Sequence, residues 1–243
     1  MLMWFPRLNW KNRPLSSYGR TLPGVKIGRW VAAVTLASVL AAPVAAAPDR
    51  TLNIVALGDS LTAGYGLAAS EAFPARLQRA LAAKGISAEI ANAGVSGDTT
   101  SGGLARFDWS VPDGTDAVIL ELGANDALRG VDPKVTRGAL EGMLRRLGER
   151  HIPVLLCGMV APRNMGPDYA RAFDAIYPDL ARQYGAILYP FFLEGVATEP
   201  KLNQRDGLHP TAAGVDVIVE RILPAVERLV TAAKTQAKAH ESR

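Results

Sequence analysis

Ala117-Val118-Ile119-Leu120-Glu121-Leu122 is a short run near the middle of the chain, with a single charge among apolar residues. Such a run is typical of a strand in a parallel sheet that is covered by helices on both faces. Four more short apolar runs lie at residues 53–57, 88–91, 154–158 and 186–189. We therefore expect a sheet of five strands.

Longer amphipathic segments separate the apolar runs and predict helices over residues 73–84, 133–150, 169–184 and 212–230. Asp132 before Pro133 is a typical helix start, Thr211 is a second cap, and Gly85 is a typical helix end. The alternation of strands and helices predicts an α/β domain with a parallel sheet between two helical layers. We assign this domain to residues 47–233 and expect residues 234–243 to form a polar, frayed tail.

Residues 1–46 have the composition of an export signal. Residues 1–29 hold six basic residues and no acidic one, and an uncharged, Ala-rich run follows from Trp30 to Pro48. Val44-Ala45-Ala46 offers the small residues that signal peptidase requires, so we predict cleavage after Ala46 and a periplasmic or secreted protein. The alternative is an uncleaved anchor, because the uncharged run is almost long enough to span a membrane.

The positive charge of the chain belongs largely to this N-terminal segment. The chain has 27 Lys and Arg against 23 Asp and Glu, and removing the six basic residues before Ala47 leaves 21 against 23, about −2. The basic character is therefore no evidence for a nucleic-acid partner. The single cysteine, Cys157, forms no intramolecular disulfide, and its apolar neighbours predict a buried core residue.

Residues that can carry chemistry follow the predicted strands. Ser60 follows the first strand, Gly97 the second and Asn125 the third, while Asp206 and His209 precede the last helix. In parallel α/β sheets such groups meet at the carboxyl edge of the sheet. Taken singly, Ser60 could be a helix cap, Gly97 a turn and Asn125 an Asx turn. Together the five supply a nucleophile, a base, a group to orient the base and two oxyanion donors.

Two other interpretations of the polar residues are weaker. His151 and His240 lie at a helix–strand junction and in the tail, where we expect both to be solvated, and no His/Asp/Glu cluster has metal-ligand spacing. We therefore expect no metal and no organic cofactor. The glycines at 58–66 resemble a phosphate loop, but no Gly-Lys-Ser/Thr follows them.

The same segments, in the same order, resemble the conserved blocks of the SGNH (GDSL) hydrolase family. Gly58-Asp59-Ser60-Leu61 matches the nucleophile block, Gly97 and Asn125 match the second and third blocks, and Asp206-Gly207-Leu208-His209-Pro210 matches the terminal block. The resemblance covers roughly residues 51–230. Segments 125–130, 161–166, 172–177 and 189–192 further resemble a bacterial periplasmic subgroup of thioesterases, lysophospholipases and arylesterases.

The resemblance implies a three-layer α/β/α sandwich of flavodoxin-like type with a five-stranded parallel sheet. It implies that Ser60 is the nucleophile, His209 the base and Asp206 the residue that orients it. The oxyanion donors would be the Ser60 and Gly97 N–H groups and the Asn125 side chain. Substrates would be small-molecule esters or thioesters of medium or long acyl chains, lysophospholipids included, without a stable protein partner and with the enzyme a monomer.

Several alternatives stay open at this point. Residues 159–169 could form one wall of the acyl site, or could simply belong to the core. On the same fold, the chain could be an esterase that removes short acyl groups from carbohydrate, or an acyltransferase. From a different class, it could be a non-catalytic, flavodoxin-like binding module.

Overall fold

The computed structural model describes residues 50–241, so the predicted export signal at residues 1–46 lies outside the described residues. The strands are β1 (Leu52–Gly58), β2 (Ala88–Gly94), β3 (Ala117–Glu121), β4 (Val154–Cys157) and β5 (Ile187–Tyr189). The α-helices are α1 (Ser60–Ala63), α2 (Phe73–Ala83), α3 (Thr100–Ala105), α4 (Phe107–Ser110), α5 (Ala124–Leu128), α6 (Pro133–Glu149), α7 (Pro167–Asp174), α8 (Ile176–Tyr184) and α9 (Ala212–Glu241). Two short 3-10 turns lie at η1 (Ala69–Glu71) and η2 (Arg163–Met165).

The five strands form one parallel sheet in the order β2-β1-β3-β4-β5, which confirms the predicted sheet. Ile54 of β1 pairs with Ile90 of β2 on one side and with Ala117 of β3 on the other. Every residue of β3 is buried. The nearly continuous apolar run at 117–122 is thus the central strand, covered on both faces as its composition predicts.

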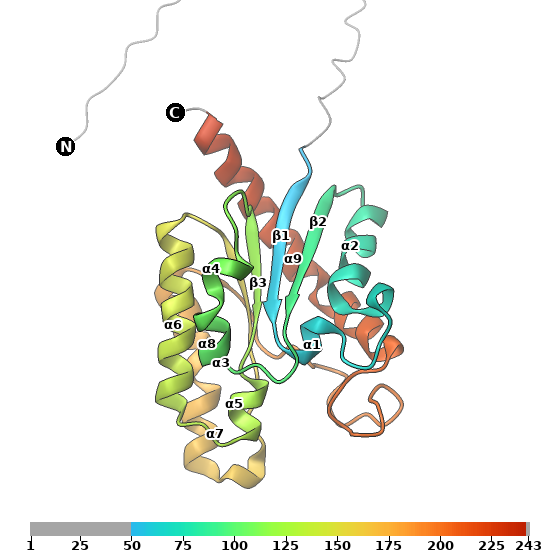
Figure 1. Ribbon diagram of the computed structural model, residues 1–243, viewed down its shortest axis with the longest axis vertical. Coiled ribbons are helices and arrows are strands. Elements are labelled where there is room, and N and C mark those ends of the chain that lie inside the picture. Colours follow the sequence, from blue (N-terminus) through green and yellow to red (C-terminus); the bar gives the residue numbers. More distant parts are fainter. Residues whose placement is uncertain (1–49, 242–243) are drawn as a thin grey trace, which may run out of the picture. The chain divides into compact units, whose positions relative to one another are not determined.

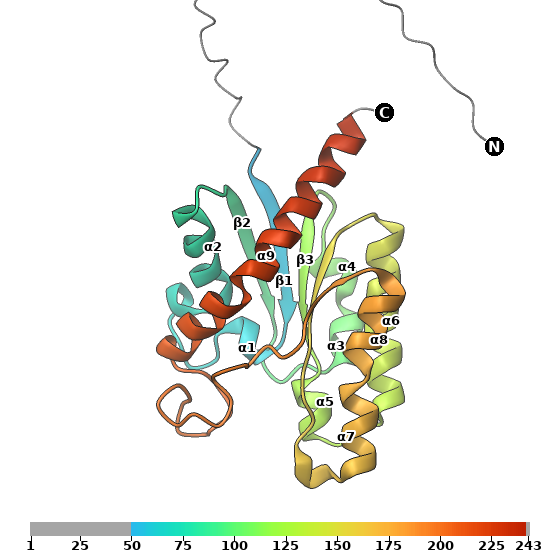
Figure 2. The ribbon, with the colours of Figure 1, turned by 180° about the vertical axis from the view of Figure 1, so that it is seen from behind.

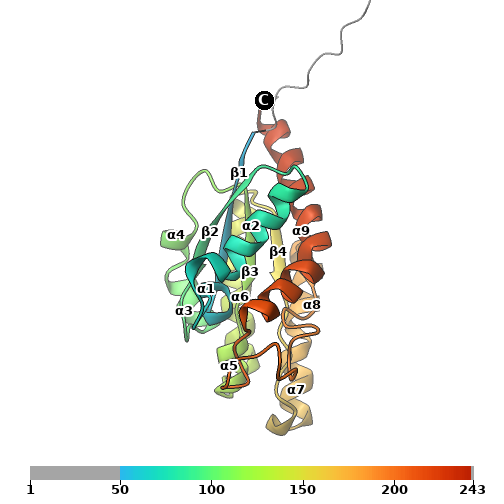
Figure 3. The ribbon, with the colours of Figure 1, turned by 90° about the vertical axis from the view of Figure 1, so that its right-hand side faces the viewer.

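Helices cover both faces of the sheet. α9 lies across one face with α2 packed beside it, while α3 and α6 pack together on the other (Figures 1 and 2). In the side view, α3 and α4 lie on one side of the strands and α9 on the other (Figure 3). Apolar side chains from both helical layers, such as Phe73, Leu140 and Ile222, are fully buried against the strands. The result is the expected three-layer α/β/α sandwich.

Two predictions were wrong, one about a helix and one about the C-terminal tail. The helix expected over 169–184 is divided into α7 and α8. Pro178 explains the division, because proline has no N–H to donate to the carbonyl four residues earlier and its ring crowds that carbonyl. The residue four positions before Pro178 is Asp174, at which α7 ends. The expected frayed tail is also helical, since α9 continues to Glu241. The segment after Ala233 contains two Ala, two Lys and one Gln, which favour helix, and it lacks Pro and Gly.

The carboxyl ends of the strands gather the segments that matter for chemistry. In Figure 1 these ends point to the lower side of the molecule, where α1, α5 and the long loop before α9 lie. β2 extends to Gly94, beyond the predicted run at 88–91, and so reaches the same edge. This is the edge at which parallel α/β sheets bind their ligands.

Candidate active site

Ser60 is the first residue of α1 and stands two positions after the end of β1. Asp59 caps this helix, because its Oδ1 accepts a hydrogen bond from the Leu61 N–H at 3.0 Å. The turn is tight, since a Cβ on Gly58 would overlap the side chain of Thr62. Ser60 is 8% exposed, so its hydroxyl lies at the base of a depression rather than on the open surface.

His209 and Asp206 reach Ser60 from the loop between β5 and α9. His209 Nε2 lies 2.9 Å from Ser60 Oγ, and His209 Nδ1 lies 2.6 Å from Asp206 Oδ2. The other carboxylate oxygen of Asp206 accepts the N–H groups of Leu208 and His209. These bonds, that to the imidazole first, lower the pKa of Asp206 to about 2. Asp206 therefore remains ionised and orients the ring.

Tyr65 and Gln204 support this arrangement, and the sequence analysis singled out neither. The Tyr65 ring packs against the His209 imidazole with centroids 4.5 Å apart and planes tilted by 38°. Gln204 Nε2 donates to the carbonyls of Tyr65 and Pro210, and the main-chain N–H of Gln204 donates to the carbonyl of His209. The histidine loop is thereby tied to the segment that follows Ser60.

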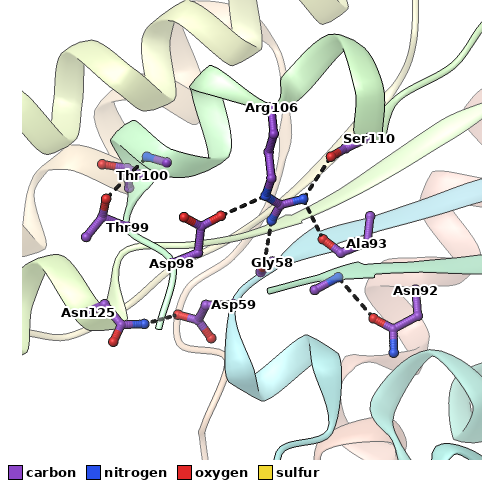
Figure 4. Close-up of polar contacts among 12 residues, drawn as sticks. Gly58, Asp59, Asn92, Ala93, Asp98, Thr99, Thr100, Arg106, Ser110 and Asn125 are labelled. Carbon is purple, nitrogen blue, oxygen red and sulfur yellow. Dashed lines mark hydrogen bonds and ion pairs between the residues drawn. The ribbon is translucent and has the colours of Figure 1, made fainter. Parts of the chain in front are cut away.

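Asn125 lies in the first turn of α5, at the end of β3, beside the residue that precedes Ser60. Its Nδ2 donates to Asp59 Oδ2 at 3.2 Å (Figure 4). Gly97 lies in the turn after β2 with a φ of +82°, and its carbonyl accepts a hydrogen bond from Arg129. Within residues 50–241, no group accepts a hydrogen bond from the N–H of Ser60 or Gly97. Both N–H groups are available to an anion.

Two buried carboxyl groups lie beneath the Ser60 turn. Burial raises the pKa of Asp59 to about 6, and burial together with the charge of Asp59 raises the pKa of Glu121 well above its ordinary value. Thr62 Oγ1 donates to Glu121 Oε2 at 2.6 Å, whereas Oε1 has no partner among the described residues. The lone acid in the apolar run at 117–122 was the sequence signal for this pair.

A pocket of about 340 Å³ opens beside Ser60, Asn125 and His209. Most of its wall is apolar and comes from three segments of the chain that follow β3, β4 and β5: Leu128, Met159, Val160, Pro162, Phe191 and Leu193. Residues 159, 160 and 162 thus belong to the wall, whereas Ala161 is buried and Tyr169 stacks on Phe173. Gly97 is not among the lining residues. In the described part of the chain, no cluster of His, Cys, Asp and Glu could hold a metal ion.

A serine, a histidine and a carboxylate in one hydrogen-bonded chain, at the carboxyl edge of an α/β sheet, define a serine hydrolase. The model of the GDSL-like lipase/acylhydrolase family matches residues 56–217. The chain belongs to this family and is a serine ester hydrolase.

The named relatives are similar over most of their length. Esterase TesA of Pseudomonas aeruginosa is 40% identical over 196 residues, which cover 80% of this chain and 96% of the relative. Thioesterase 1/protease 1/lysophospholipase L1 of Escherichia coli is 38% identical over 187 residues, covering 76% and 87%. The crystal structure of AlinE4, an SGNH-hydrolase family esterase, matches with a TM-score of 0.63 at 51% identity and covers 74% of this chain and 96% of its own.

Proposed function

We propose that the chain hydrolyses carboxylic esters or thioesters through an acyl-enzyme formed on Ser60. The observation that carries this proposal is the continuous hydrogen-bonded chain from Ser60 Oγ to His209 Nε2 at 2.9 Å and from His209 Nδ1 to Asp206 at 2.6 Å. A serine hydroxyl is a weak nucleophile until a neighbouring base accepts its proton. Asp206 holds the imidazole in the orientation that leaves Nε2 free to do so.

The reaction proceeds in two acyl transfers. Ser60 Oγ attacks the acyl carbonyl while its proton passes to His209 Nε2. The carbonyl oxygen becomes an oxyanion and accepts hydrogen bonds from the N–H groups of Ser60 and Gly97 and from the Asn125 side chain. Collapse expels the alcohol or thiol, which takes the proton from His209. Water then attacks the acyl-enzyme with His209 again as base, and the acid and free Ser60 are released.

The substrate class follows from the pocket. Its wall is largely apolar and is built from Leu128, Met159, Val160, Phe191 and Leu193, so it favours an alkyl chain over a sugar. The relatives' names include thioesterase, lysophospholipase and arylesterase, which agrees with an acyl chain as the shared feature. We therefore favour medium or long acyl groups on small molecules. A carbohydrate deacetylase would need polar groups along this wall.

The test is hydrolysis of p-nitrophenyl esters from acetyl to palmitoyl by the mature chain and by Ser60→Ala. We expect activity that peaks at medium or long chains and that disappears in the variant. A strict preference for acetyl would move the assignment to deacetylation while keeping Ser60. Undiminished hydrolysis by a folded Ser60→Ala variant would overturn the nucleophile assignment.

We also propose that the enzyme is exported. The support is the basic segment at 1–29 followed by the Ala-rich run that ends at Ala46, both of which precede the described residues. None of the helices described in residues 50–241 is long and apolar enough to cross a membrane. Fractionation of cells that express the full chain tests this: a periplasmic product beginning at Ala47 is expected, and an uncleaved product in the membrane fraction would favour the anchor.

A further inference from the structure

We propose that Arg106 is a positioning residue for the oxyanion site. Its guanidinium holds the turn that carries Gly97 at a fixed place relative to the turn that carries Ser60. The inference rests on the proposed function, because it concerns two of the oxyanion donors assigned there. Arg106 itself touches neither substrate nor the reacting atoms in this assignment, and it acts through the main chain.

One guanidinium binds four acceptors that belong to three segments. Nη2 donates to the Gly58 carbonyl at 2.9 Å, and Nη1 donates to the Ala93 carbonyl at 2.9 Å and to Ser110 Oγ at 2.8 Å. Nε donates to Asp98 Oδ2 at 2.7 Å. Figure 4 shows these groups around the guanidinium, beside the ends of β1 and β2. A planar fork with five donors suits such a task, and an ammonium does not.

The acceptors are neighbours of the proposed donors. Gly58 is the last residue of β1 and stands two positions before Ser60, while Asp98 directly follows Gly97. The Gly58 carbonyl accepts a second hydrogen bond from the Val95 N–H at 3.1 Å. One of its two donors, Val95, thus lies in the β2–α3 connection, and the other, Arg106, directly follows α3. Arg106 therefore links the turn that carries Ser60 to the turn that carries Gly97 through hydrogen bonds to residues close to both.

Two glycines allow close packing near the two turns. A Cβ on Gly94 would overlap the main-chain nitrogen of Ala63, so β2 and α1 meet backbone to backbone. A Cβ on Gly102 would overlap Asp98 Oδ1, so the glycine makes room for the carboxylate that Arg106 binds. The Arg106 and Asp98 side chains are only 21% and 13% exposed, and water screens their charge pair weakly.

The hydrogen bonds of Arg106 matter for the chemical step, because they fix the two turns relative to each other. Oxyanion stabilisation depends on donors that are already placed where the charge develops, and a displacement of about 1 Å can cost about 100-fold in rate. Loss of the Arg106 hydrogen bonds should therefore lower kcat and leave the binding of the acyl chain, and hence KM, nearly unchanged. A merely structural role would change stability and have no such selective effect.

Arg150 provides a matched control at the other end of the strands, where their amino ends lie. Its guanidinium also binds two main-chain carbonyls, those of Val111 and Pro112, and lies 3.6 Å from an Asp113 carboxylate oxygen. It is 28% exposed, close to the value for Arg106. Arg106→Lys and Arg150→Lys each keep the charge and remove the fork, so they should cost similar stability.

The experiment compares Arg106→Lys, Arg150→Lys and Asp98→Ala on the p-nitrophenyl ester that the wild type hydrolyses best. Thermal unfolding is followed for each variant. We expect kcat of Arg106→Lys to fall about 10- to 100-fold with KM within about twofold of wild type. Asp98→Ala should fall in the same way, and it serves as the test if Arg106→Lys does not fold. Arg150→Lys should keep its kcat.

A trifluoromethyl ketone with a matching alkyl chain supplies the second readout, because its adduct with a serine places an oxyanion where the transition state does. Its inhibition constant should rise in Arg106→Lys by the factor by which kcat/KM falls. Wild-type kcat and inhibition in folded Arg106→Lys or, if that variant does not fold, in Asp98→Ala would overturn the inference, and so would an equal loss in Arg150→Lys. Ser60→Ala is included because full activity there would contradict the proposed function instead.

Discussion

The amide nitrogen of Asn125 lies 3.2 Å from Oδ2 of Asp59, the residue immediately before Ser60. One carboxylate thus caps the helix that begins at Ser60 and orients the side chain that we propose as an oxyanion donor. An amide has two N–H groups, so Nδ2 can donate to Asp59 and to an oxyanion at the same time.

Replacement of Asn125 by alanine should lower kcat about 10²- to 10³-fold, the usual loss when one oxyanion donor is removed. KM should change little, since the donor acts mainly on the transition state. Steady-state kinetics on several p-nitrophenyl esters measures both constants. Full turnover of the folded variant on all of them would remove Asn125 from the assignment.

Asp59→Asn tests whether Asp59 acts through Asn125. The substituted amide retains an oxygen that can cap α1, but it cannot accept from Leu61 and from Asn125 as two carboxylate oxygens do. We expect kcat to fall about tenfold and the double variant Asp59→Asn/Asn125→Ala to be no slower than Asn125→Ala alone. Losses that multiply in the double variant would show that the two residues act independently.

Asp206→Asn should lower kcat about 10³- to 10⁴-fold, because the amide no longer selects the imidazole orientation that accepts the Ser60 proton. The pKa of Asp206 is lowered to about 2, so its ionised form also stabilises the fold above its ordinary pKa, and this contribution is lost as the pH falls through about 2. Thermal unfolding of wild type and variant between about pH 5 and about pH 2 measures it. A stability advantage of wild type over the variant that grows towards low pH would contradict this direction.

Glu121→Gln should make the fold less sensitive to alkaline pH. Because the pKa of Glu121 is raised by burial and by Asp59, its neutral form is favoured in the folded state, and its contribution to stability is lost as the pH rises through that raised pKa. Glutamine is neutral at every pH. Urea unfolding should show that wild type loses more stability than the variant between about pH 5 and about pH 9. Glu149→Gln, at an exposed position of α6, is the control and should behave as wild type does.

Gly94→Ala should destabilise the fold by about 1–3 kcal/mol, because the added methyl would overlap the main chain of α1. Gly138→Ala on α6 is the matched control: nothing lies within 4 Å of its added Cβ, and alanine favours helix by about 0.5–1 kcal/mol over glycine. Urea unfolding should therefore give changes of opposite sign. Two changes of the same sign would contradict the close approach of β2 and α1.

The five-stranded parallel sheet and the gathering of Ser60, Asn125, Asp206 and His209 at one edge follow from local patterns, whereas the order of the strands in the sheet was not predicted. Each residue stands just after a short apolar run or just before the last helix, and parallel strands bring those positions together. The contacts of Arg106 with Gly58 and of Tyr65 with His209 do not follow, because they join segments whose spacing depends on the packed sheet. The break between α7 and α8, just before Pro178, could have been predicted, since proline disfavours a continuous helix.

The assignment of Ser60 as nucleophile and His209 as base is tested most directly by mass spectrometry of the purified protein after treatment with a p-nitrophenyl alkylphosphonate, which transfers its phosphonyl group to an activated serine. We predict one adduct per chain, on the peptide that contains Ser60, and none in His209→Ala over the same time, because the base that activates the hydroxyl is missing. An adduct on a different residue, or labelling of Ser60 at the wild-type rate without His209, would contradict the assignment of Ser60 and His209 as nucleophile and base.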